Sequence, residues 1–210
     1  MEKPELLFLS ERWLVVSKPA GWLTIPGRSH ASSPPVLLAW ATLEHGPVWV
    51  VHRLDRETSG VVLMARSSQD HRQANLWFQS RKIRKVYHCL AMGDPSLPLF
   101  KIQQAIEGAP SCTQVEVKER FKGGFLAQVL PLTGRRHQIR IHLSAQGHPI
   151  FGDTQYGGIP GCTLGSVELG FSRVALHSSS LTLPTGEGFS APFPSDFQEW
   201  LHLMRKAKLP

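Results

Sequence analysis

The chain has few cysteines, and they are not spaced for a disulfide framework or a zinc site. Its 210 residues include three of them, Cys89, Cys112 and Cys162, without a C-x-x-C pair. Disulfide-stabilised small proteins and zinc-binding domains both need a more regular pattern. We therefore expect reduced thiols and a fold stabilised by its hydrophobic core, for which 41% apolar residues are sufficient.

Long apolar runs, low-complexity tracts and internal repeats are also missing. No stretch approaches the ~20 apolar residues that a membrane-spanning helix needs, and charges interrupt the short apolar run near the N-terminus. The sequence thus predicts a cytoplasmic protein with no membrane partner. Its length fits one large domain.

Acidic residues are outnumbered by basic ones. Lysine and arginine total 23 against 16 aspartates and glutamates, which gives a formal net charge of +7. A positive surface attracts polyanions, so nucleic acid is the leading candidate partner. Charge alone does not separate a binding protein from an enzyme, and the motifs must decide.

Eighteen glycines and sixteen prolines, scattered along the chain, favour many short elements and a mixed α+β fold over a helical bundle. The segment 6–26 predicts two short strands around the turn Ser10–Arg12, followed by a loop at Lys18–Gly21. Further strands are predicted in 48–51, 60–66, 85–93, 113–121, 124–132, 174–184 and 188–194. Helical spacing predicts helices over 36–46 (entered from Ser32–Pro35 and burying Val36, Leu37, Trp40 and Leu43), 68–81 (capped by Ser67 or Ser68), and after Ser195, which is expected to cap the last helix. Residues 137–146 could form a strand or a helix, and Gly147 followed by Pro149 favours the helix. Residues 93–111 show no clear periodicity.

The segment HRLDRETSG, residues 52–60, places many polar groups on a loop between two apolar strands. A surface turn with local ion pairs is one interpretation. Asp55 favours another, because a carboxylate between Arg53 and Arg56 is held ionised and is therefore nucleophilic at neutral pH.

The segment TGRRHQIRIHLSAQGHPIFGDTQYGG, from Thr133, concentrates arginine and histidine. On a helix, His137, Arg140 and Ser144 share one face. That face could rest on phosphates or simply be solvated. A metal site is a third interpretation, but the spacing of the candidate ligands fits no zinc pattern, so we expect no metal. Those candidates are His52, His137, His142, His148, Asp153 and His177.

Four blocks of the sequence together resemble the RluA family of pseudouridine synthases. The hallmark H-R-L-D-x-x-T-S-G is present as HRLDRETSGVVLMA, from His52 to Ala65. VVSKPAGWLTIP resembles the family's Lys-Pro-x-Gly block, RKVYHCLAMG its K-x-Y strand, and GRRHQIRIHLSAQGHPIFGDTQYG its G-R-x-H-Q-I-R block. The final SRVALHSSSLTLPTGEGFSAPFPSDF resembles the family's closing strands more loosely. Together the blocks follow the family's order and leave only about 94–111 unmatched.

The resemblance implies a fold and a set of site residues. The fold is the α+β pseudouridine synthase catalytic domain, a bent and mainly antiparallel mixed sheet with flanking helices and a central cleft. Asp55 is implied as the nucleophile, Arg140 as the basic residue that pairs with it, and Tyr87 as the active-site tyrosine that stacks on the uracil. Arg53 is implied to contact the substrate. Phosphate contact for Arg140 and an ordinary strand aromatic for Tyr87 are the alternatives.

The resemblance also implies the partners. The enzyme isomerises uridines in structured RNA, ribosomal or transfer RNA, after flipping the base out of its stack, and it needs no cofactor. We expect a monomer with a single catalytic domain over residues 1–210 and no separate N-terminal RNA-binding domain. Candidate contacts to the RNA backbone are Arg81, Lys82, Arg84, Lys85, Arg135 and Arg136. A non-catalytic RNA-binding module on the same scaffold is the alternative function.

Overall fold

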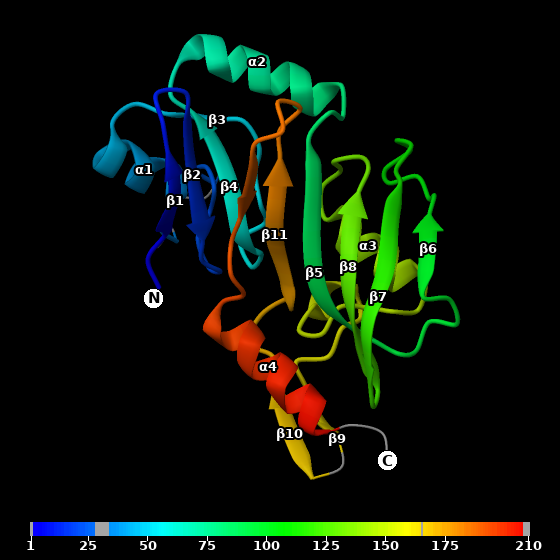
Figure 1. The fold of residues 1–210 in the computed structure, drawn as a ribbon. Coiled ribbons are helices and arrows are strands. Elements are labelled where there is room, and N and C mark those ends of the chain that lie inside the picture. The colour runs from blue at the N-terminus through cyan, green and yellow to red at the C-terminus, as the bar shows by residue number, and fades with distance from the viewer. Residues whose placement is uncertain (1, 28–33, 165, 208–210) are drawn as a thin grey trace. The chain divides into compact units, whose positions relative to one another are not determined.

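The computed structural model describes residues 2–27, 34–164 and 166–207. Its contacts divide the chain into two compact units. The first comprises Met1–Lys85 and Ser178–Pro192, and the second comprises Val86–His177 and Phe193–Pro210. Strands β5 (Arg84–Met92) and β11 (Leu176–Thr182) have residues in both units (Figure 1).

The first unit is a sheet with two helices. Its strands are ordered β1-β2-β4-β11, with β3 paired to β4 and β12 paired to β11. The pairings β1–β2, β2–β4, β3–β4 and β11–β12 are antiparallel. The bounds are β1 Glu5–Leu9, β2 Trp13–Lys18, β3 Trp49–Val50, β4 Ser59–Ala65, β12 Gly188–Ser190, α1 Leu37–His45 and α2 Ser68–Gln79.

Local sequence explains the β1–β2 hairpin and the start of α2. In the predicted turn, Ser10 Oγ accepts hydrogen bonds from the backbone N–H groups of Arg12 and Trp13. Ser67 caps α2 as expected, because its Oγ accepts from the N–H of Asp70 at 3.0 Å. All seven residues of β4 are buried, which agrees with the apolar run predicted there.

Helix α1 forms where it was predicted, but one of its expected core residues is wrong. Leu37 and Ala41, four residues apart, face the core. Leu43 is 82% exposed, and Val36 and Trp40, which were also expected in the core, are half-buried. Each residue turns the helix by about 100°, so Leu43 points away from the face that carries Ala41. The expected entry at Ser32 lies outside the described residues.

The second unit contains a four-stranded antiparallel sheet ordered β5-β8-β7-β6 and a separate β9–β10 pair. Strands β7 and β8 form the predicted hairpin, and β6 lies in the stretch that showed no periodicity. The bounds are β6 Leu99–Ile102, β7 Thr113–Phe121, β8 Gly124–Pro131, β9 Gly161–Leu164, β10 Val167–Gly170, α3 Gln138–Ala145, the 3-10 helix η1 Thr154–Tyr156 and α4 Ser195–Lys206.

Helix α4 buries the apolar face that its spacing predicted, Phe197, Trp200, Leu201 and Met204. Ser195 is not its cap: the N-cap is Pro194, and Ser195 is the first helical residue. The helices α2 and α4 are the longest described, with 12 residues each. In the described part of the chain, no helix has the length and apolar character needed to cross a membrane.

The three cysteines are free thiols, as expected. Burial raises the pKa of Cys89 to about 12, and it also raises the pKa of Cys162. A thiol with such a high pKa carries little thiolate at neutral pH. Cys89 is therefore a core residue of the second unit rather than a reactive one.

Candidate active site

The HRLD segment lies on the loop between β3 and β4, and hydrogen bonds hold its backbone on both sides of Asp55. Before Asp55, Thr24 Oγ1 accepts from the N–H of Leu54 at 3.2 Å and donates to its carbonyl at 3.1 Å. After Asp55, the carbonyl of Arg56 accepts from the N–H of Gly21 at 2.9 Å. The Lys-Pro-x-Gly block and the hallmark loop are thus one local structure.

The buried side chain of Lys18 also supports the backbone of these two segments. Its side chain is fully buried, and Nζ donates to the carbonyls of Pro19, Trp22 and Arg56 at 2.9, 2.9 and 3.2 Å. A buried ammonium is costly unless its donors are satisfied, so these carbonyls must remain in place around it. The lysine therefore fixes the backbone next to Asp55.

Asp55 is half-buried, and its carbonyl accepts from the N–H of Thr58 at 3.1 Å, which closes a turn. Arg53 and Arg56 are exposed on either side of it. Arg56 Nε lies 3.3 Å from Glu57 Oε1, so the loop also contains one of the local ion pairs considered from the sequence. The structure brings Arg53 and Asp55 together on one ordered turn.

His52 anchors the start of the hallmark. Its Nε2 accepts from the N–H of Leu63 at 3.0 Å, and its ring stacks on Phe78 with centroids 5.0 Å apart. Burial and, to a lesser extent, the nearby charge of Lys85 together lower the pKa of His52 to about 3. The imidazole is neutral at neutral pH and serves as a hydrogen-bond acceptor that ties the loop to β4.

Gly60 closes the hallmark for a steric reason. Its φ is +117°, and a Cβ at this position would lie 2.1 Å from the carbonyl oxygen of Ser178. Strand β11 approaches β4 too closely for any side chain here. The S-G end of the motif is thus a packing requirement of the sheet.

In the second unit, Arg140 forms a buried, two-pronged ion pair with Asp153. Arg140 Nε and Nη2 each lie 2.7 Å from one oxygen of that carboxylate. Nη2 also donates to Gln155 Oε1 at 3.2 Å, and the guanidinium lies 4.9 Å from the ring centre of Tyr156. Arg140 is 6% exposed and Asp153 is 1% exposed, so the pair fixes the guanidinium plane in a dry environment.

The predicted face of helix α3 is confirmed by its contacts. His137 Nδ1 is hydrogen-bonded to the hydroxyl of Tyr156 at 2.9 Å, and Ser144 Oγ donates to the carbonyl of Tyr156 at 2.6 Å. Arg140 lies between them on the same segment. His137 is the N-cap and has φ +52°, a left-handed conformation that is uncommon for a side-chain-bearing residue.

Tyr87 belongs to the second unit, as does Arg140, whereas Arg53 and Asp55 belong to the first. Tyr87 is half-buried on β5, pairs with Val129 of β8 and packs on the core of its unit. Sequence reasoning missed Asp153 as the partner of Arg140 and considered it only as a metal ligand. It also missed Lys18 and Thr24 as supports of the loop.

The histidines considered for a metal site each have a structural contact. His142 binds Thr113 Oγ1 and the carbonyl of Gln104, and His148 binds the carbonyl of Met92. The ring of His177 packs near Phe193 and Phe197. Within the described residues, no three histidine, cysteine or acidic side chains are grouped to hold a metal ion.

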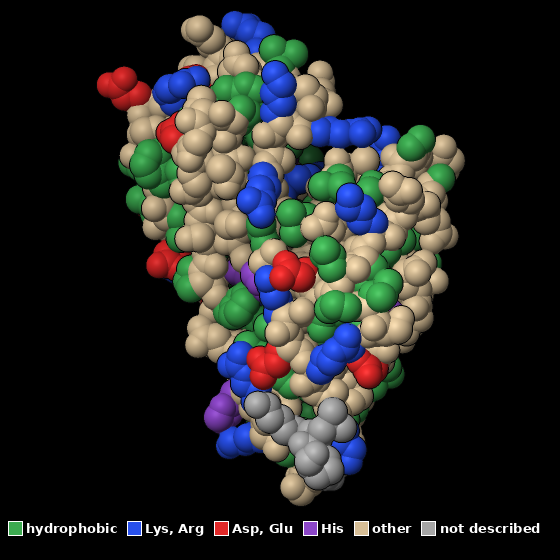
Figure 2. Space-filling view, turned by 45° about the vertical axis from the view of Figure 1, so that its right-hand side comes forward, with side chains coloured by type: hydrophobic (Ala, Val, Ile, Leu, Met, Phe, Trp, Pro, Cys, Tyr) green, Lys and Arg blue, Asp and Glu red, His purple; other side chains and the backbone are tan. Residues whose placement is uncertain are grey.

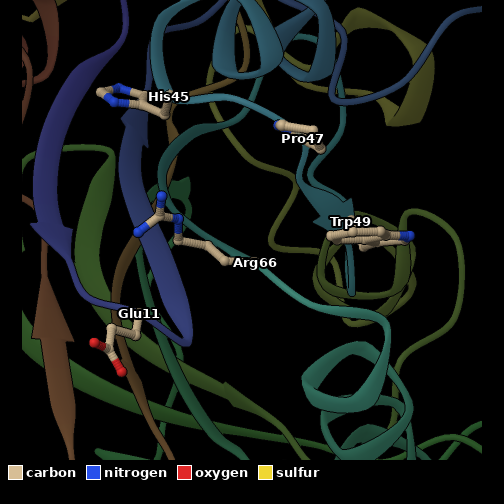
Figure 3. Close-up of a pocket in the computed structure, with 5 residues that line it drawn as sticks. All are labelled: Glu11, His45, Pro47, Trp49 and Arg66. Atoms are coloured by element: carbon tan, nitrogen blue, oxygen red, sulfur yellow. The ribbon is translucent and has the colours of Figure 1, made fainter.

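A cavity of about 470 Å³ lies elsewhere in the first unit, lined by Glu11, His45, Pro47, Trp49 and Arg66 (Figure 3). Trp49 pairs with Ala65 at the end of β4, whereas Asp55 precedes the start of that strand. None of the four predicted site residues lines this cavity.

Comparison with known proteins identifies the family. Residues 12–145 match the family described as RNA pseudouridylate synthase. The match includes Asp55, Tyr87 and Arg140. The chain belongs to this family. As an RNA pseudouridine synthase, it is an isomerase that acts on RNA.

Two curated relatives match this chain along most of their own length. The dual-specificity RNA pseudouridine synthase RluA of Salmonella typhi is 32% identical, with 91% of this chain and 93% of the relative covered. The ribosomal large subunit pseudouridine synthase D of Pseudomonas aeruginosa is 30% identical, with 96% and 72% covered. The expected membership of the RluA family is confirmed.

Solved structures confirm the fold. Human RNA pseudouridylate synthase domain containing 4 aligns with a TM-score of 0.77 at 23% identity, covering 96% of this chain and 93% of the human one. Human RNA pseudouridylate synthase domain containing 1 aligns with a TM-score of 0.73 at 24% identity, covering 100% and 97%. The expected α+β catalytic fold of pseudouridine synthases is therefore confirmed.

Proposed function

We propose that Asp55 is the nucleophile with which this enzyme converts uridine to pseudouridine. The reaction breaks the bond from the sugar to the ring nitrogen, turns the uracil, and rejoins it through a ring carbon. It is an isomerisation, so it consumes no redox partner or group donor. The carboxylate of Asp55 attacks either the anomeric carbon of the sugar or a carbon of the ring.

The fixed backbone around Asp55 is the observation that carries this proposal. Hydrogen bonds hold Leu54 on one side and Arg56 on the other, and buried Lys18 supports the second of these. A nucleophile is most effective when the scaffold fixes its position before the substrate arrives. A charged surface turn with no chemical role would not need this support.

The other site residues take the roles that the family resemblance implies. Arg140 pairs with Asp55 and orients its carboxylate, and the orientation of Arg140 itself is set by Asp153. Tyr87 stacks on the flipped uracil and assists removal of the proton from the ring carbon. Arg53 contacts the RNA around the flipped nucleotide.

A tritium-release assay tests the nucleophile. RNA labelled at carbon five of uridine should lose tritium with the wild-type protein, and Asp55→Asn should abolish the release. Glu57→Gln is the matched control, because it removes a neighbouring carboxylate that is paired with Arg56. Release that persists in Asp55→Asn would refute the role of Asp55. RNA binding without release by the wild type would favour a non-catalytic RNA-binding module.

The substrate we propose is structured RNA, ribosomal or transfer. The names of the relatives support this choice, since one refers to the ribosomal large subunit and another to dual specificity. Mapping pseudouridine in both RNA classes, in cells with and without the gene, identifies the target. A monomeric state and a cytoplasmic location stay predictions from the sequence, which gel filtration and cell fractionation check.

A further inference from the structure

The turn between α2 and β5 has an arginine where glycine is usual. The N–H of Lys82 donates to the carbonyl of Trp77 at 2.9 Å, and the N–H of Arg81 donates to the carbonyl of Phe78 at 3.2 Å. These two bonds form a Schellman motif, whose residue after the cap takes a left-handed conformation. Arg81 occupies that position with φ +57°. Glycine adopts this conformation without strain, whereas arginine does not.

Among the residues that the structure describes, no contact of the side chain explains an arginine at this position. Its side chain is exposed, and among the described residues it forms no ion pair or hydrogen bond. A strained residue that contributes nothing to packing is a reason to look for a functional role of its side chain.

Arg81 is one of four cations in five residues, Arg81–Lys85, which we call the basic turn. Arg81, Lys82 and Arg84 are exposed, and no described carboxylate pairs with any of them. Lysine and arginine side chains occur at many points of the surface in Figure 2. Some exposed cations elsewhere in the chain are ion-paired within their own unit, for example in Arg12–Asp70, Arg120–Asp94, Lys118–Glu116 and Arg205–Glu119.

The basic turn is also fixed in position. Ile83, at its centre, is 6% exposed and packs in the core of the first unit. Ser80 Oγ donates to the carbonyl of Leu76 at 2.6 Å and secures the end of α2. Charges on an anchored turn lose less side-chain and backbone freedom when they bind a partner than charges on a mobile loop.

The turn neighbours the hallmark loop within the first unit. Phe78, which accepts one bond of the Schellman motif, stacks on His52. Lys85, at the end of the turn, is close enough for its charge to lower the pKa of His52. His52 is followed directly by the exposed Arg53 and, two residues later, by Asp55.

We propose that Arg81, Lys82 and Arg84 bind backbone phosphates of the RNA strand that carries the target uridine. Unpaired cations on a fixed turn beside the hallmark loop suit a polyanion that must be held while one base is extruded. Arginine forks match phosphate oxygens, and the adjoining lysine adds a compact charge. This surface rests on the proposed function, because it takes the substrate RNA as its partner.

The test compares two triple variants with the same net charge. Arg81→Gln/Lys82→Gln/Arg84→Gln changes the basic turn, and Lys101→Gln/Lys122→Gln/Lys206→Gln removes three exposed lysines of the other unit. Each reduces the formal charge from +7 to +4. RNA dissociation constants are measured over a series of salt concentrations, and tritium release gives kcat and KM. Circular dichroism confirms that both variants are folded.

For the turn variant, the slope of log affinity against log salt should fall by roughly two to three, and KM should rise about tenfold or more with kcat within about threefold. The control should change the slope by less than about one. Equal slopes in both variants, or a lower kcat with unchanged KM, would overturn the proposal. The two proposals can fail separately. If the turn variant shows the expected smaller slope but the wild-type protein releases no tritium, the proposed catalysis is refuted and the role of the basic turn in RNA binding stands.

Discussion

Two groups of arginines in this enzyme differ in what neutralises them. In the second unit, Arg140 is buried and its charge is met by the carboxylate of Asp153. In the first unit, Arg81 and Arg84 are exposed, with no described carboxylate beside them. The first arrangement lies within the fold and sets the orientation of the Arg140 side chain. The second leaves positive charge for a partner that the protein does not contain.

The difference shows how one residue type serves two purposes. A buried arginine with a two-pronged carboxylate is a positioning device, because its bonds define both the distance and the plane of the guanidinium. Exposed arginines without partners contribute little to stability and much to attraction of a polyanion. Mutations should therefore affect folding at Asp153 and RNA binding at the basic turn.

The largest effect on stability is expected at the buried pair. Asp153→Ala removes the carboxylate and leaves the Arg140 guanidinium buried, so the free energy of unfolding should fall by about 3–5 kcal/mol. Urea unfolding followed by circular dichroism measures it. Asp196→Ala is the matched comparison: Arg173 is as buried as Arg140, but the Asp196 side chain is 33% exposed and its pair should cost less, about 1.5–3 kcal/mol. Equal losses of unfolding free energy in the two variants would show that burial of the carboxylate does not determine the cost of removing it.

His52 reports on the region beside the basic turn. Its pKa is about 3 in the folded protein, lowered by burial and by Lys85, against 6.5 for the free side chain. Between these values the unfolded chain binds the extra proton. The contribution of His52 to stability is therefore fully present above pH 6.5 and is lost as the pH falls toward 3.

Replacing His52 with glutamine should remove this sensitivity to acid. Glutamine keeps an acceptor for the N–H of Leu63 but takes up no proton in this range. Between pH 6.5 and 5, the wild type should lose about 1.7 kcal/mol more stability than His52→Gln, since the unfolded histidine is half-protonated at pH 6.5 and a full proton contributes about 1.4 kcal/mol per pH unit. Urea unfolding at several pH values measures the difference. Parallel curves for the two proteins would show that His52 does not titrate between the folded and unfolded states.

Much of this fold could be predicted because local signals and burial agree. The turn at Ser10–Arg12, the cap at Ser67 and the apolar face of α4 all follow from spacing and hydrogen-bonding chemistry. The predicted burial of Leu43 was wrong because a nine-residue helix has a narrow buried face, and hydrophobicity alone does not say where that face ends. The split of the contacts into two units depends on long-range packing that no local pattern contains.

The candidate site could also be predicted only in part. Helical spacing placed His137, Arg140 and Ser144 on one face, and their contacts to Tyr156 agree with it. Asp153 could not be predicted as the partner of Arg140, because it lies 13 residues further along the chain, beyond the helix, and a carboxylate suits a metal as well as an arginine. Lys18 was missed for another reason: lysines are mostly exposed, so a buried one is revealed only by the carbonyls around it.

The smallest expected effect is also the sharpest test of the basic turn. Arg81→Gly relieves the left-handed conformation and should raise the free energy of unfolding by about 1 kcal/mol while weakening RNA binding. Glu107→Gly, at φ +51° on an exposed loop of the second unit, should stabilise similarly without weakening binding. Thermal unfolding and RNA titration on both variants separate the two outcomes. If Arg81→Gly gained stability and kept full affinity for RNA, the arginine at this strained position would have no role in binding. Arg81 and Arg140 would then differ only in how deeply their side chains are buried.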